Sequence, residues 1–146
     1  MPKITFILGL CASGKSHIAK ELQKEKDTEI LDEGFSKFSN NFEENYSQVI
    51  LGLRNGKDFI IIEIGLCRRS EREYVIQGLQ SDITNIEVEW ICISNDLAQA
   101  NQNVLDRANR GEKQNPEGHI DINNRVALEY TYPEGAKIIP TFRPTS

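Results

Sequence analysis

The segment with the clearest chemical signature spans residues 9–16 and reads Gly-Leu-Cys-Ala-Ser-Gly-Lys-Ser. This G-x-x-x-x-G-K-S spacing is typical of a backbone loop that wraps around phosphate groups, because glycines permit close approach and successive N–H groups point inward. Lys15 would bridge the outer phosphates, and the Ser16 hydroxyl would ligate Mg²⁺. We therefore expect a nucleoside triphosphate with Mg²⁺ as the ligand. The residues expected to contact it are Gly9, Cys11, Ala12, Ser13, Gly14, Lys15, Ser16 and His17.

Acidic residues follow two apolar runs, at the point where the carboxyl ends of parallel strands would meet a ligand. Asp32 and Glu33 come directly after residues 29–31, and either could bind a substrate hydroxyl and accept its proton, or help to hold the metal. An exposed turn is the alternative for this pair. Glu63 lies in the run 59–64, where an ionised carboxylate needs a partner. Mg²⁺, reached through water, would be that partner, and a nearby arginine is the alternative.

Arginines gather at two places along the chain. Arg68, Arg69 and Arg72 lie just after the third apolar run, where three cations suit an anionic or hydroxyl-bearing substrate. A solvated helix start is the alternative interpretation. Arg107 and Arg110 flank the beginning of an irregular segment, and we expect them to stabilise the charge that develops on a phosphoryl group during transfer.

Short β-branched runs alternate with helical patterns along the chain. Most of these runs are apolar on successive residues, as in strands that are covered on both faces. Strands separated by helices form βαβ units, so the expected fold class is α/β, with a parallel sheet and helices on both faces. The expected strands are 4–8, 29–31, 59–64, 87–93 and 137–139, and the helical patterns lie at 16–26, 42–53, 75–79 and 97–108, the last with Ser94 or Asn95 as its N-cap.

One segment interrupts this alternation. Residues 109–119 contain no aliphatic side chain and are rich in turn-forming residues. We expect a short mobile lid over about residues 109–120, with an ordinary solvated loop as the alternative. Asp121 would then cap a short helix that carries Ile122, Val126 and Tyr130.

Length and composition limit the possible classes of protein. The chain has 146 residues, which predicts a single domain over residues 1–146. Its 17 Lys and Arg against 22 Asp and Glu give a net charge of −5, which argues against extensive contact with a nucleic-acid backbone but allows a short single-stranded end. Three widely spaced cysteines favour a reducing compartment, and the opening apolar run is too short to span a membrane. We expect a cytoplasmic protein without membrane contact, and its oligomeric state stays open.

From about residue 4 to residue 139 the sequence resembles the small P-loop kinases related to nucleoside, nucleotide, gluconate and shikimate kinases. It is most similar to the kinase domain of the phage-type 5′-hydroxyl polynucleotide kinases. The resemblance implies the P-loop NTPase fold, with about five parallel strands, the first central, and ATP over the loop. It also implies a general base at Asp32 or Glu33, a carboxylate at the third strand at Glu63, and a lid of Arg-x-x-Arg-Gly type at residues 107–111.

The sequence departs from that pattern at three points. The third-strand acid of the family is usually Asp, whereas this chain has Glu63. Polar residues often found just beyond it are replaced by Ile64 and Gly65, and the sequence ends soon after the fifth strand, which could leave the adenine side shallow. These departures affect the expected metal geometry and substrate more than the nucleotide site.

Two functions from different classes follow from these observations. The first is an ATP- and Mg²⁺-dependent kinase that transfers the γ-phosphoryl group to a hydroxyl of a small molecule, of nucleoside or sugar type, or to a nucleic-acid 5′ end. The second is a nucleotide-binding switch or module with little catalytic activity that acts through a protein partner.

Overall fold

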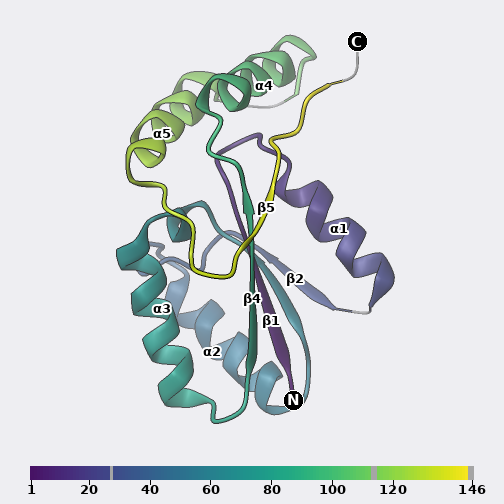
Figure 1. The fold of residues 1–146 in the computed structure, drawn as a ribbon, viewed down its shortest axis with the longest axis vertical. Coiled ribbons are helices and arrows are strands. Elements are labelled where there is room, and N and C mark those ends of the chain that lie inside the picture. Colours follow the sequence, from purple (N-terminus) through teal and green to yellow (C-terminus); the bar gives the residue numbers. More distant parts are fainter. Residues whose placement is uncertain (27, 113–114, 145–146) are drawn as a thin grey trace.

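The computed structural model describes residues 1–26, 28–112 and 115–144, and its strands form one parallel sheet (Figure 1). The strand order is β2-β3-β1-β4-β5, and every neighbouring pair is parallel. This confirms the expected α/β class with the first strand at the centre. The strands are β1 (Lys3–Leu8), β2 (Glu29–Asp32), β3 (Phe59–Ile62), β4 (Glu87–Ile93) and β5 (Lys137–Ile139).

Helices cover both faces of the sheet. Figure 1 shows α1 on one side, α2 and α3 on the other, and the α4–α5 pair beyond the carboxyl ends of the strands. No helix in the described ranges is long and apolar enough to cross a membrane. The helices are α1 (Lys15–Glu25), α2 (Phe42–Arg54), the 3₁₀ helix η1 (Ile64–Cys67), α3 (Arg69–Asp82), α4 (Leu97–Asn109) and α5 (Pro116–Glu129).

The two central strands are apolar on successive residues because both of their faces are buried. On one face, Phe6 and Ile61 belong to the large core that includes apolar side chains of α2 and α3. On the other face, Ile7 and Ile62 pack with Ala19 of α1. This packing fixes β1 and α1, and with them the loop that joins them.

Two expected boundaries move because polar side chains cap the neighbouring helices. The strand expected over residues 59–64 ends at Ile62, and Glu63 accepts a hydrogen bond from the Gly65 N–H to begin η1. The N-cap of α4 is Asp96, which accepts from the Gln99 N–H, rather than Ser94 or Asn95.

The segment between α4 and α5 is shorter than the expected lid. Asn115 accepts a hydrogen bond from the Gly118 N–H and caps α5, which begins at Pro116 and not near Asp121. Proline suits a first helical position because it has no N–H to leave unsatisfied. The connection therefore runs from residue 110 to 115, and the expected lid residues 113 and 114 lie outside the described residues.

Candidate active site

The loop at residues 9–16, here called the phosphate loop, lies between the carboxyl end of β1 and the start of α1. Gly14 has a φ of 111° and is the N-cap of α1, with no side-chain cap hydrogen bond. A Cβ atom at Gly9 would lie 2.6 Å from Ser13 Oγ and 3.1 Å from Ile93 Cβ, so the loop is too tight there for any larger residue. Because a helix cannot satisfy its own first N–H groups, those of α1 are available to an anion at this point.

The Lys15 side chain is folded back over the phosphate loop. It is 8% exposed, and its Nζ donates to the carbonyl oxygens of Gly9 at 2.7 Å and Leu10 at 3.1 Å. Ser13 Oγ is buried and is the side-chain polar atom without a hydrogen-bond partner among the buried residues that the structure describes. A buried cation beside an unpaired hydroxyl is a cradle that fits a phosphate group.

A hollow of ≈ 260 Å³ lies over the phosphate loop. Arg107 of α4 and Phe142 of the C-terminal segment form its other walls. The Phe142 N–H donates to the Ser13 carbonyl at 2.9 Å, so this segment is tied directly to the loop. The hollow is lined by Ala12, Ser13, Gly14, Lys15, Ser16, His17, Arg107 and Phe142, which include all of the expected nucleotide contacts except Gly9 and Cys11.

Of the two acids after β2, the structure brings Glu33 to the phosphate loop. Glu33 has a φ of 66°, and its N–H donates to the Ile62 carbonyl at 2.7 Å. Its Oε2 accepts from the Ile64 N–H at 3.2 Å, and its Oε1 lies 4.0 Å from Lys15 Nζ. Asp32 is exposed and makes no side-chain hydrogen bond or ion pair within the described residues. The left-handed backbone at Glu33 turns its side chain into the site and leaves Asp32 on the outside.

The surroundings of Glu33 shift its titration toward neutral pH. Burial raises the pKa of Glu33 to about 8, with the Glu63 carboxylate adding to the rise and the Lys15 charge opposing it. The side chain is still 44% exposed, so an acceptor could reach it from solvent. A carboxyl group with a pKa in this range is suited to proton transfer under physiological conditions.

Glu63 is held by backbone amides. It is 4% exposed, its Oε1 accepts from the Phe35 N–H at 2.8 Å, and its Oε2 accepts from the Gly65 N–H at 2.8 Å. Among the described residues these two amides, rather than an arginine, are the partners that the buried carboxylate requires. Glu63 thereby joins the segment after β2 to the end of β3.

The acids and hydroxyls around the loop are compatible with Mg²⁺. Ser16, Glu33 and Glu63 supply hard oxygen atoms, the donors that Mg²⁺ prefers. The described part of the chain has no group of three Asp, Glu, His or Cys residues that could hold a metal ion by itself.

The architecture is shared with solved structures of other proteins. No protein-family model and no curated protein matches the sequence. The structure is similar to a gluconokinase from Sinorhizobium meliloti 1021, with a TM-score of 0.61 and 10% identity over 98% of this chain and 85% of that one. A putative kinase from Chloroflexus aurantiacus gives a TM-score of 0.63 and 16% identity, over 96% and 84% of the two chains. A fungal RNA kinase gives 0.64 and 11%, over 99% and 76%.

The chain has the fold of the P-loop kinases. This confirms the resemblance for the sheet and for the placement of the phosphate loop. At these identities the likeness between this chain and its structural neighbours extends to the fold.

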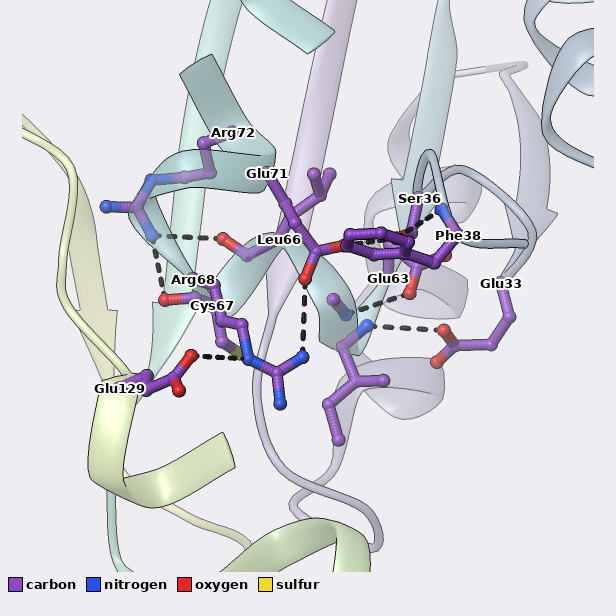
Figure 2. A network of polar contacts seen from close by, with 12 residues as sticks. Glu33, Ser36, Phe38, Glu63, Leu66, Cys67, Arg68, Glu71, Arg72 and Glu129 are labelled. Carbon is purple, nitrogen blue, oxygen red and sulfur yellow. Dashed lines mark hydrogen bonds and ion pairs between the residues drawn. The ribbon is translucent and has the colours of Figure 1, made fainter. Parts of the chain in front are cut away.

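Three arginines at the start of α3 have different surroundings within this P-loop kinase fold. Arg68 Nε donates to Glu129 Oε2 at 2.7 Å, and its Nη1 donates to Glu71 Oε2 at 3.3 Å (Figure 2). Arg69 is 77% exposed and pairs with Glu73 one helical turn along. Neither contact is with the phosphate loop, so a substrate contact of these two arginines stays a prediction.

Arg72 is a structural clamp in this structure, where the sequence had left a substrate contact and a solvated helix start equally open. It is 6% exposed. Its Nη1 donates to the carbonyls of Leu66, Cys67 and Thr131 at 2.9–3.0 Å, and its Nη2 donates to the Thr131 hydroxyl at 2.8 Å. The guanidinium therefore ties η1 to the segment after α5, which leaves it turned toward backbone oxygens.

We expect Arg72→Met to lower the free energy of unfolding by about 2–4 kcal/mol, because buried carbonyls lose their donor while the apolar stem is retained. Urea unfolding measures the change. Arg69→Met is the matched control, with an expected loss below about 0.5 kcal/mol for an exposed pair. If both variants were equally stable and only Arg72→Met lost turnover, Arg72 would have to be a substrate contact.

The two arginines expected at the lid are separated in the structure. Arg107 lines the hollow over the phosphate loop. Arg110 is 57% exposed and pairs with Glu112 at 2.8 Å, outside the hollow. In this state Arg107 alone of the two lines the nucleotide hollow.

Sequence reasoning missed three residues that contact the phosphate loop. They are Asn103 and Asn123, whose side chains bind its backbone, and Phe142, which lines the hollow. The asparagines carried no signal, because buried polar residues do not follow an apolar periodicity. Phe142 lies in a proline-flanked segment after β5. Its position just beyond the carboxyl end of a strand was the one feature of the sequence that could have indicated a place near the site.

Proposed function

We propose that this chain is an ATP-dependent phosphotransferase that moves the γ-phosphoryl group of ATP to a hydroxyl group. The observation that carries the proposal is the 4.0 Å separation of Lys15 Nζ and Glu33 Oε1 at the carboxyl edge of the sheet. A phosphate held by Lys15 would lie beside a carboxylate that can take a proton, which are the two groups that this transfer needs.

Each group around the phosphate loop has a defined task in this proposal. The first amides of α1 and the Lys15 ammonium hold the phosphate chain of ATP. The acceptor oxygen forms a bond to the γ-phosphorus as the bond to the bridging oxygen breaks, its proton passes to Glu33, and ADP leaves. Arg107, on the wall of the hollow, would stabilise the charge on the moving group.

The Ser16 hydroxyl would hold Mg²⁺ together with phosphate oxygens, and Glu63 would reach it through water. When bound, the ion would supply neutralisation of the phosphate charge. The exposed position of Ser16 at the first turn of α1 supports this assignment.

The acceptor is proposed to be a small hydroxyl compound of nucleoside or sugar type, or a nucleic-acid 5′ end. Structural neighbours named as a gluconokinase and an RNA kinase support this range. The net charge of −5 favours a small acceptor or a short end over a long polyanion. We place the activity in the cytoplasm, in keeping with the three free cysteines.

A panel of acceptors with γ-labelled ATP tests the proposal. Sugars, sugar acids, nucleosides and short 5′-hydroxyl oligonucleotides are incubated separately with the protein, ATP and Mg²⁺. We expect label transfer to one class, at a rate at least about a hundredfold above that without acceptor. ATP binding without acceptor-stimulated turnover across the panel would contradict it and favour the nucleotide-binding switch.

A further inference from the structure

Asn123 of α5 is bound to the backbone of the phosphate loop at two points. The side chain is 0% exposed. Its Oδ1 accepts from the Cys11 N–H at 2.7 Å, and its Nδ2 donates to the Cys11 carbonyl at 3.2 Å and to Asn101 Oδ1 at 3.1 Å. The carboxamide therefore satisfies the amide and the carbonyl of one loop residue, and Asn101 fixes its orientation.

Asn103 of α4 makes a second connection one residue along the loop. It is 4% exposed, and its Nδ2 donates to the Ala12 carbonyl at 3.0 Å and to the Phe142 carbonyl at 2.8 Å. Gln99 Nε2 donates to Asn103 Oδ1 at 2.9 Å, which fixes this amide as well. Two helices beyond the sheet thus hold consecutive residues of the phosphate loop.

These contacts have a consequence for the loop's conformation. Ala12 has a φ of 63°, a left-handed conformation that costs a non-glycine residue about 1 kcal/mol or more. A loop that contains three small residues and two glycines would otherwise sample many conformations and would lose that freedom on binding. Hydrogen bonds to Cys11 and Ala12 select one conformation before a ligand arrives.

The contacts also decide which amides can face a ligand. The Cys11 N–H is directed at Asn123 and the Ser13 N–H donates to the Leu10 carbonyl at 3.2 Å, so neither is available to phosphate. The amides at the start of α1 remain available, because a helix cannot satisfy them. An anion would accordingly bind toward α1, on the side where Lys15 lies.

We propose that Asn123 and Asn103 are positioning residues, which hold the phosphate loop in its binding conformation and make the α4–α5 pair part of the nucleotide site. The proposal rests on the proposed function for the identity of the ligand. It predicts that loss of either amide weakens binding of the polyphosphate part of the nucleotide and leaves the rest of the ligand unaffected.

Binding of inorganic tripolyphosphate with Mg²⁺, measured by calorimetry at 15 °C, tests this directly. We expect Asn123→Ala to weaken tripolyphosphate and ATP binding by the same factor, about tenfold, as the loss of one or two hydrogen bonds that hold the loop would cause. The ATP KM should rise by that factor, while kcat at saturating ATP changes less than about threefold.

Val126→Ala is the control for a purely structural role. Val126 is 2% exposed on the same helix and belongs to the large core, and its apolar side chain has no atom that could hydrogen-bond to the phosphate loop, so this variant tests the loss of packing alone. We expect its tripolyphosphate affinity to stay within twofold of the wild type. Equal weakening in both variants, or none in Asn123→Ala, would overturn the proposal. Where Asn123→Ala does not fold, Asn103→Ala is measured against the same control.

Hydrogen exchange on the unaltered protein gives a second test that needs no variant. We expect the Cys11 amide to be protected without ligand, and the amides of residues 14–16 to gain protection when tripolyphosphate binds. Protection of Cys11 only in the presence of ligand would overturn the preformed loop. A failure of the proposed function would give a different result from these two tests. The wild-type protein would then bind ATP without transferring phosphate, or would not bind ATP at all.

Discussion

Replacement of Lys15 by methionine is expected to lower turnover by a factor of about a thousand or more and to weaken ATP binding strongly. Lys15 is 8% exposed, and its ammonium donates to the carbonyls of Gly9 and Leu10 in the phosphate loop. A single preorganised donor in such a site contributes about 10²- to 10³-fold to a rate, and the charge of lysine adds to that value. Methionine retains the apolar stem, so the change removes chiefly the charge.

Lys20→Met is the matched control for this substitution. Lys20 lies on the exposed side of the same helix, so the variant loses the same charge without touching the loop. Steady-state turnover and calorimetry with Mg²⁺ and ATP are measured on both variants. Unchanged ATP affinity in Lys15→Met would remove the basis for a nucleotide site at residues 9–16.

The sequence was sufficient to predict the elements that position the phosphate loop. Strands that are buried on both faces are apolar on successive residues, and β1 and β3 have this pattern almost without interruption. The phosphate loop is formed by consecutive residues, so its spacing can be recognised directly in the sequence. The central position of the first strand followed from the resemblance, and the structure confirms it.

The residues that complete the site depend on contacts between distant parts of the chain. Asn123 binds Cys11 across 112 positions in sequence, and no period or spacing links the two. A substrate contact was one of two interpretations of Arg72, because its charge suits an anion, yet its donors are used by buried carbonyls. Side-chain type indicates what a residue can bind, and the packing decides which partner it meets.

Which of Asp32 and Glu33 faces the phosphate loop also could not be predicted from the sequence, because it depends on one backbone torsion. Both residues follow β2, and their chemistry is nearly identical. The φ of 66° at Glu33 directs its carboxylate to the Ile64 amide and toward Lys15. A left-handed torsion at a residue other than glycine is uncommon, so the sequence contained no sign of it.

Glu33→Gln is expected to lower kcat by a factor of about 10² to 10⁴, the usual contribution of a general base. Glutamine keeps the size and the hydrogen bond from the Ile64 N–H but cannot accept a proton from the acceptor hydroxyl. Asp32→Asn is the neighbouring control, because Asp32 is exposed on the outside of the site. We expect its kcat to stay within about threefold of the wild type, as for an exposed side chain away from the reaction.

The pH profile distinguishes a proton acceptor from a residue that only shapes the site. Burial raises the pKa of Glu33 to about 8, so the ionised fraction of this group increases as the pH rises through that value. Since the base acts in its ionised form, kcat/KM should rise from about pH 6 and level off above about pH 9, because this parameter reports the free enzyme. In Glu33→Gln the rise should be absent, whereas Asp32→Asn should retain it.

The opposite pattern would identify the other acid as the base. If Asp32→Asn lost both activity and the rise with pH, the backbone at residues 32–34 would have to turn over when the acceptor binds. Glu33 would then serve as a partner of Lys15 in the empty site. Because Lys15 lowers the pKa of Glu33, Lys15→Met offers a separate check: it should move the pH dependence of its residual turnover to higher pH only where Glu33 is the titrating group.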